Sequence, residues 1–88
     1  MVWTVKRTDT FLETFARVRS NKQIIKELGK KIQRLGEDPD NVGGWLSGSL
    51  HGKKSTRIAK RYRLIFRLDE REHVVYLIAI DHRRQVYK

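Results

Sequence analysis

The spacing of apolar positions near the start of the chain changes from strand-like to helix-like. Residues 2–6 alternate weakly and are rich in strand formers, which predicts a first strand. The residues that follow place apolar side chains at i, i+1, i+4 and i+7, which is typical of one helical face. These residues are Phe11, Leu12, Phe15 and Val18. Thr10 and Glu13 have the spacing of a capping box, and Thr8 is a competing N-cap.

A second helix is predicted to begin at Ser20, because Gln23 three residues later gives the spacing of another capping box. Its apolar stripe consists of Ile24, Ile25, Leu28, Ile32 and Leu35. Gly36 is expected at the C′ position, with Pro39 beyond the helix end. Gly29 inside this helix costs ~1 kcal/mol relative to alanine, and we expect a neighbouring backbone to approach it closely. The short joint between the helices predicts a helical hairpin.

Residues 36–54 hold five of the six glycines and the only proline, which predicts a loop. We expect Trp45, Leu46 and Leu50 to hold this loop against the core. Three strands are predicted after it, at about 54–59, 62–69 and 73–81. The segment from Val74 to Ile80 is apolar on both faces, as in a central strand.

The middle of these strands shows a clear period of two. Its one face carries Tyr62, Leu64, Phe66 and Leu68, and its other face carries Arg63, Ile65 and Arg67. The element order is therefore β-α-α-β-β-β. We predict an α+β fold, with a helical hairpin packed on a small antiparallel sheet. The length of 88 residues indicates a single domain over 1–88.

Charge changes the picture, because the formal net charge is +10. Residues 1–44 contribute 9 Lys+Arg and 6 Asp+Glu, or +3, and residues 45–88 contribute 11 and 4, or +7. No acidic residue occurs between Asn41 and Leu68. Nucleic acid or an acidic protein is the expected partner. A membrane surface is disfavoured because the excess charge does not fall on the helical part.

Other features narrow the class of protein. The longest apolar run is too short to span a bilayer, and the first residues lack the apolar region of a signal peptide. Cysteine is absent, so the composition fits a cytoplasmic protein. The three histidines are far apart in sequence, so no metal site is predicted. The sequence contains neither the motif of a phosphate-binding loop nor a recognisable Ser/His/Asp arrangement.

The charged hairpin at residues 53–68 has a predictable register. If residues 59–61 form the turn, Arg57 lies directly opposite Arg63, and Ile58 pairs with Tyr62 on the core side. Like charges opposite each other destabilise a sheet, and no acidic residue is interleaved here. A charge run is usually a solvated face, but this arrangement favours an anion-binding site.

The C-terminal residues strengthen that interpretation. Read singly, His82 is an ordinary surface histidine and Tyr87 a packed aromatic residue. With Arg83 and Arg84, they follow the central strand directly and reach the end of the sheet that carries the paired arginines. Together these residues predict a cluster that handles phosphate.

The segment "SLHGKKSTRIAKRYRLIFRLDEREHVVYLIAIDHRRQVYK" resembles the RelE/ParE superfamily of toxins from type II toxin–antitoxin modules. The resemblance lies in the "RI…YRLIFR" hairpin, the apolar strand and the terminal "HRRQVY", and it extends over nearly the whole chain. It implies a RelE-like mRNA interferase, which is a metal-independent endoribonuclease that cuts mRNA in the ribosomal A site. It also implies that no cofactor is needed and that the partners are a cognate antitoxin, the ribosome and mRNA.

The resemblance implies a set of site residues. The catalytic candidates are Arg57, Arg63, His82, Arg83 and Tyr87. The RNA-binding candidates are Lys53, Lys54, Lys60, Arg61 and Arg84. The family has lysines near the position of Arg57, and arginine is a poor general base because it stays protonated. Proton transfer therefore stays open among Lys54, Lys60 and His82.

Two other functions stay open at this point. A ParE-like toxin would act on DNA gyrase and would not cut RNA. A non-catalytic RNA-binding protein on the same fold would use an arginine-rich face equally well. Fold alone does not decide between them.

Overall fold

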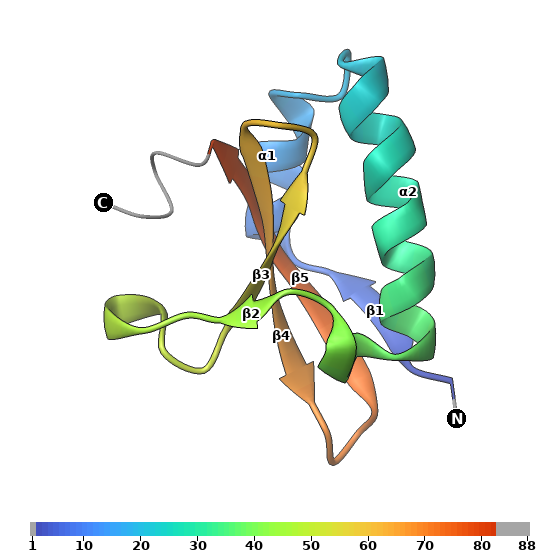
Figure 1. Ribbon diagram of the computed structural model, residues 1–88, viewed down its shortest axis with the longest axis vertical. Helices are drawn as coiled ribbons and strands as arrows, with labels where there is room; N and C mark the ends of the chain where they lie inside the picture. Colours follow the sequence, from blue (N-terminus) through green and yellow to red (C-terminus); the bar gives the residue numbers. More distant parts are fainter. Residues whose placement is uncertain (1, 83–88) are drawn as a thin grey trace.

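The computed structural model describes residues 2–82 of the 88. The elements follow the predicted order, with one short strand and two 3-10 turns added (Figure 1). They are β1 (Thr4–Arg7), α1 (Asp9–Ala16), α2 (Lys22–Glu37), η1 (Pro39–Asn41), β2 (Gly44–Trp45), η2 (Gly48–Leu50), β3 (Lys54–Ile58), β4 (Tyr62–Asp69) and β5 (Val74–His82).

The strands form one five-stranded sheet in the order β1-β5-β4-β3-β2. β1 pairs with β5 in parallel, whereas the other neighbours are antiparallel. The α+β class is therefore confirmed, but the prediction of an antiparallel sheet is wrong. After β1, both helices carry the chain to the opposite edge of the sheet, where β2 begins. The chain then comes back strand by strand, and its last strand, β5, lies next to β1 and runs parallel to it.

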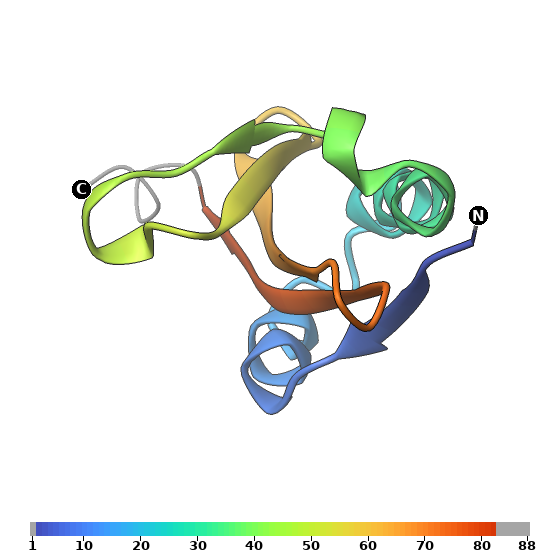
Figure 2. The ribbon, with the colours of Figure 1, turned by 90° about the horizontal axis from the view of Figure 1, so that it is seen from below.

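The two helices cover the sheet in different places (Figure 2). α1 packs along β5, whereas α2 packs on β1, β3 and η1. The two helices follow one another across a short connection, as predicted, and each packs on its own part of the sheet. They share one main core with the sheet, centred on fully buried residues such as Ile24, Leu64 and Phe66.

The helix ends differ from the predicted ones because contacts elsewhere decide them. The Thr8 hydroxyl accepts a hydrogen bond from the Phe11 N–H at 3.2 Å and donates one to the Leu77 carbonyl of β5 at 2.7 Å. This second bond selects Thr8 over Thr10 as the N-cap. Asn21, not Ser20, caps α2, and its Oδ1 accepts from two backbone N–H groups.

α2 also continues past its predicted end. Gly36 lies within the helix, and its carbonyl accepts a hydrogen bond from the Trp3 N–H at 2.7 Å. The expected close approach at Gly29 is wrong, since a Cβ there would meet no atom within 4 Å.

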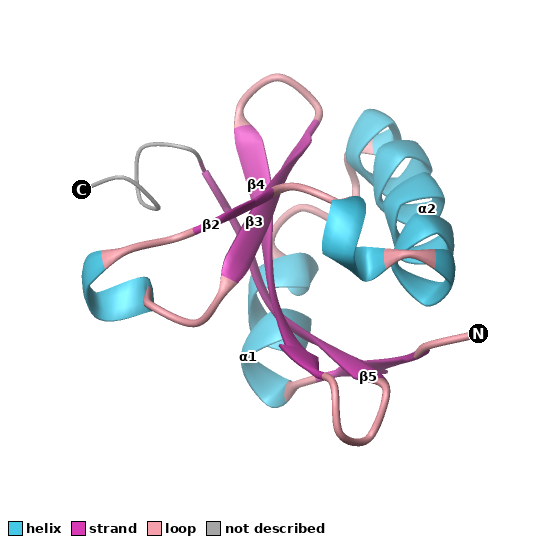
Figure 3. Cartoon of the chain, turned by 60° about the horizontal axis from the view of Figure 1, so that its bottom comes forward, coloured by secondary structure: helices cyan, strands magenta, loops and turns pink. Residues whose placement is uncertain are grey.

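The glycine-rich segment is more ordered than a plain loop (Figure 3). Its β2 pairs with β3, with Trp45 opposite Lys54. Leu46 and Leu50 pack on a small second cluster formed by Ile65 and Ala79, as predicted. Trp45 does not, because it is 65% exposed. This segment therefore covers part of the sheet face that the helices leave open.

Candidate functional site

The β3–β4 hairpin places two arginines side by side. Arg57 lies opposite Arg63, and Ile58 lies opposite Tyr62, so residues 59–61 form the predicted turn. The register prediction is confirmed. Ala59 begins the turn with φ of 54°, in the left-handed region that a non-glycine residue seldom adopts.

An acidic residue adjoins this pair. Asp81 on β5 is the register partner of Arg63, so Arg57, Arg63 and Asp81 form one cross-strand row, here called the arginine row. The prediction that no acid is interleaved is wrong, because β5 runs through His82 and brings Asp81 alongside β4. Residues directly opposite on one face lie within ~5.5 Å at Cβ, so this carboxylate offsets part of the repulsion.

The arginine row lies next to the small second cluster on the outer face. The neighbouring row consists of Ser55, Ile65 and Ala79, on which Leu46 and Leu50 pack. Arg63 is half-buried beside this cluster, whereas Arg57 is exposed. Charges beside apolar packing act at a lower local dielectric than in free solution, so they attract an anion more strongly.

Lys54 does not belong to this surface. It is 2% exposed, and its ammonium donates to the Asp40 carbonyl at 2.7 Å and the Pro39 carbonyl at 3.3 Å. The ammonium also lies 5.1 Å from the Trp45 ring centroid. Lys54, Thr56 and Ile58 share the helix-facing side of β3, so Lys54 lies on the opposite side of the sheet from the paired arginines. The sequence signal for this orientation is that Lys54 and Ile58 are four residues apart, since residues an even number apart on a strand lie on the same face.

Replacing Lys54 by methionine keeps most of the side-chain volume and removes only the ammonium. We expect the free energy of unfolding to fall by about 2 kcal/mol, because two backbone carbonyls lose a charged donor. RNA affinity should stay at the wild-type level. Urea denaturation and RNA titration measure the two quantities. Unchanged stability with weakened RNA binding would return Lys54 to the RNA-binding surface.

His82 lies on the other side of the sheet from the arginine row. It is the register partner of Tyr62, whose face is the helix-facing one, and the two rings meet edge-on at 5.5 Å. It lines a cleft of about 220 Å³ together with Thr14 and Arg17 of the α1 region, and Asp81 reaches this cleft as well. His82 reaches the end of the sheet that carries the paired arginines, as predicted, but alternation along β5 turns it to the opposite face from Asp81.

The remaining candidates fall into two groups. Lys60 and Arg61 are exposed on the hairpin turn, and Lys53 is half-buried just before β3. Arg83, Arg84 and Tyr87 lie outside the described residues, so their predicted roles stay predictions.

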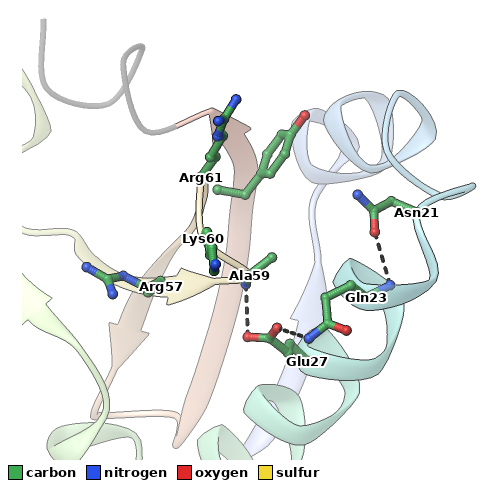
Figure 4. A pocket seen from close by; sticks show the side chains of 8 residues that line it. Asn21, Gln23, Glu27, Arg57, Ala59, Lys60 and Arg61 are labelled. Atoms are coloured by element: carbon green, nitrogen blue, oxygen red, sulfur yellow. Dashed lines mark hydrogen bonds between the residues drawn. The ribbon is translucent and has the colours of Figure 1, made fainter.

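A cleft of about 550 Å³ separates the hairpin turn from the first turns of α2 (Figure 4). Glu27 closes its floor, accepting a hydrogen bond from the Ala59 N–H at 2.9 Å and another from the Gln23 amide at 2.5 Å. The Gln23 bond and then the Ala59 bond lower the pKa of Glu27, with smaller contributions from Lys30 and Lys31. Glu27 thus stabilises the left-handed residue that begins the turn. Sequence reasoning missed it because no local pattern marks a contact across 32 residues.

Replacing Glu27 by alanine removes the acceptor for the Ala59 N–H. We expect amide hydrogen exchange over residues 59–61 to become severalfold faster, because the turn keeps its unfavourable φ without its tether. Glu13→Ala, on the exposed face of α1, is the matched control. Equal exchange in both variants would show that Glu27 does not hold the turn. Since the folded pKa is lowered, the tether's stabilisation is present above the ordinary pKa of glutamate and is lost as the pH falls through the lowered value.

Residues 2–82 offer neither a membrane-spanning helix nor a metal-binding cluster. None of the helices there is both long and apolar enough to cross a membrane. That part of the chain also holds no cluster of three or more His, Asp or Glu residues placed to ligate a metal ion.

Comparison with known proteins decides the family. Residues 5–87 match the sequence profile described as the ParE toxin of type II toxin-antitoxin system, parDE. The chain belongs to this toxin family. No curated protein matches it significantly in sequence.

Solved structures of related toxins share the fold. The RelBE2 toxin–antitoxin complex from Mycobacterium tuberculosis contains a chain that is 26% identical, with a TM-score of 0.72, covering 94% of this chain and 100% of that one. YafQ from E. coli gives a TM-score of 0.80 at 10% identity over 98% and 99% of the two chains. A mutant of the E. coli toxin RelE gives 0.74 at 19% identity over 99% and 92%. The toxin therefore has the RelE-like fold of two helices on a mixed five-stranded sheet.

Proposed function

We propose that this toxin is a metal-independent endoribonuclease that cuts mRNA in the ribosomal A site and so stops translation. The observation that carries the proposal is the placement of Arg57 directly opposite Arg63 on a sheet face beside Asp81. Two fixed guanidinium groups on neighbouring strands suit a phosphate, because each offers several N–H donors in a planar fork.

The proposed reaction uses the RNA's own 2′-hydroxyl as nucleophile. The 2′-oxygen attacks the adjacent phosphorus, its proton passes to a base, and the bond from phosphorus to the 5′-oxygen breaks. The leaving 5′-oxygen takes up a proton, and the other product ends in a 2′,3′-cyclic phosphate. Negative charge grows on the phosphoryl oxygens in the transition state, where Arg57 and Arg63 would stabilise it.

The candidates for proton transfer are Lys54, Lys60 and His82. Lys54 is held by two carbonyls on the helix-facing side, and His82 lies on that side as well. Lys60 is the candidate that is exposed on the turn joining Arg57 to Arg63. On the family pattern, Arg83 would add a second phosphate-stabilising arginine, and Tyr87 would stack on a base.

We further propose that a cognate antitoxin covers the basic surface until the toxin is released. The toxin chain of similar fold from Mycobacterium tuberculosis was solved in a complex with its antitoxin, which supports a partner of this kind. An acidic or amphipathic segment would complement the net charge of +10.

A second function is favoured by one specific observation, since the matching profile is that of ParE. On the family pattern, ParE-like toxins inhibit DNA gyrase and do not cut RNA. The paired arginines weigh against this function for the present chain, since they form a site suited to a single phosphate.

Primer extension on a defined mRNA separates these functions. We expect discrete cuts within A-site codons when ribosomes are programmed with the mRNA, and no cuts in the same RNA when it is free. A gyrase supercoiling assay runs in parallel. Intact RNA in both samples together with inhibited supercoiling would replace the nuclease proposal by the ParE-like one.

A further inference from the structure

The outer face of α2 is strongly basic. Lys26, Lys30 and Arg34 follow one another at intervals of four residues and are exposed, and Lys31 beside them is half-buried. Four residues of helix rise ~6 Å, so these cations form a regular row, similar in spacing to successive phosphates of a nucleic-acid strand. The apolar side of α2 is buried in the core, which leaves the basic side to solvent. The expectation that the helical part carries little of the charge is therefore incomplete.

This row adjoins the hairpin turn through two neighbouring clefts. A cleft of about 370 Å³ runs along the basic side of α2 and is lined by Lys26, Lys30, Lys31 and Arg34. The cleft at the turn shares Gln23 and Glu27 with it, and Arg57, Lys60 and Arg61 line its far wall (Figure 4). The six cations other than Arg57 are here called the helix–hairpin surface.

Glu27 is the one acidic residue among the described residues that line the two clefts. Both of its carboxylate oxygens accept hydrogen bonds, one from Gln23 and one from Ala59. The carboxylate is thus committed to joining α2 to the turn. A bound anion would meet the surrounding cations while this contact keeps the two halves of the surface together.

We propose that the helix–hairpin surface binds the sugar–phosphate backbone of folded RNA, next to the arginine row, which reaches the turn cleft at Arg57. The chemistry of the α2 cleft favours RNA over protein, since none of its six described lining residues is apolar. Protein interfaces rely on buried aromatic or aliphatic anchors, whereas backbone binding needs only spaced cations and polar groups. A lipid surface fits poorly, because a helix lying on a membrane presents its apolar side to it.

The proposal does not depend on cleavage. The arginine row would act on the strand that is cut, whereas the helix–hairpin surface would hold neighbouring RNA by its backbone. Binding to an RNA duplex without a cleavage site therefore tests this surface even if the nuclease proposal fails.

The test is a triple variant, Lys26→Gln with Lys30→Gln and Arg34→Gln, titrated with a fluorescent RNA duplex over a range of salt concentrations. The matched control neutralises Lys6, Arg19 and Arg71, which are exposed and line neither cleft. Both variants lower the net charge by the same amount. We expect the triple variant to raise Kd by about tenfold or more and to reduce the slope of log K against log salt by roughly 2–3. The control variant should change the Kd and the salt slope far less.

Three outcomes would overturn the proposal. Equal losses in the two triple variants would mean that only net charge matters. An unchanged salt slope in the α2 variant would mean that its cations do not meet phosphates. Polyglutamate, titrated in parallel, stands in for an acidic protein. If the triple variant keeps its RNA affinity but no longer binds polyglutamate, the surface would be assigned to an acidic protein. If circular dichroism shows that the triple variant is unfolded, the single variant Lys30→Gln tests the proposal instead. It should reduce the slope of log K against log salt by roughly 1.

Discussion

Replacing Arg63 by alanine is expected to slow cleavage of ribosome-bound mRNA by ~10- to 10³-fold, as when one fixed donor to a transition-state charge is removed. The guanidinium would otherwise meet the phosphoryl oxygens as their charge grows. Because Arg63 is half-buried and lies opposite Asp81, its removal also takes away the cation next to that carboxylate. Single-turnover primer extension at saturating ribosome concentration measures the rate of the chemical step.

Arg67→Ala is the matched control for this experiment. Arg67 lies on the same strand, is exposed, and stacks over the Tyr76 ring with its guanidinium carbon 4.4 Å from the ring centroid. It therefore tests the loss of one positive charge from the same face without touching the arginine row. Cleavage by Arg67→Ala should stay near the wild-type rate. Equal slowing of both variants would mean that Arg63 acts only through overall charge.

Replacing Gly43 by alanine is expected to lower the free energy of unfolding by about 3 kcal/mol or more. Gly43 has φ of 67°, and a Cβ there would lie 2.1 Å from the Ser55 carbonyl oxygen. No rotation of a side chain relieves a contact with backbone, so β2 must move away from β3. Urea denaturation followed by circular dichroism measures the loss.

Gly29→Ala provides a control in which the free energy of unfolding should change in the opposite direction. Gly29 is exposed in the interior of α2, and a Cβ there meets nothing within 4 Å. We expect this variant to stabilise the protein by about 0.5–1 kcal/mol, because alanine has the higher helix propensity. Similar stability changes for both variants would contradict the close contact between Gly43 and β3.

The central hairpin could be predicted from the sequence because apolar and charged residues alternate on either side of its turn. Ile58, Tyr62 and Leu64 fix which side is buried, and a slip of one residue would have turned Arg63 into the core. The pairing of Arg57 with Arg63 follows from this parity and from the three-residue turn. The strand from Tyr62 to Asp69 begins and ends where the pattern predicts.

The parts that were not predicted depend on contacts between distant residues. β2 is only two residues long inside a glycine-rich segment, so it carries no periodic signal. The parallel position of β1 depends on how two helices return the chain to the sheet, which spacing alone does not encode. Glu27 binds the hairpin turn from another element. The sides of the sheet on which Lys54 and His82 lie, by contrast, follow from the same alternation along β3 and β5.

The most direct test of the central claim is cleavage of an mRNA with one 2′-deoxynucleotide at the position where the wild-type message is cut. The ribosome, the codon and the toxin stay the same, and only the proposed nucleophile is missing. We predict that cleavage is lost at this position and is retained when the deoxynucleotide lies elsewhere in the message. Undiminished cleavage at the deoxy position would contradict attack by the 2′-hydroxyl, and with it the role proposed for the arginine row.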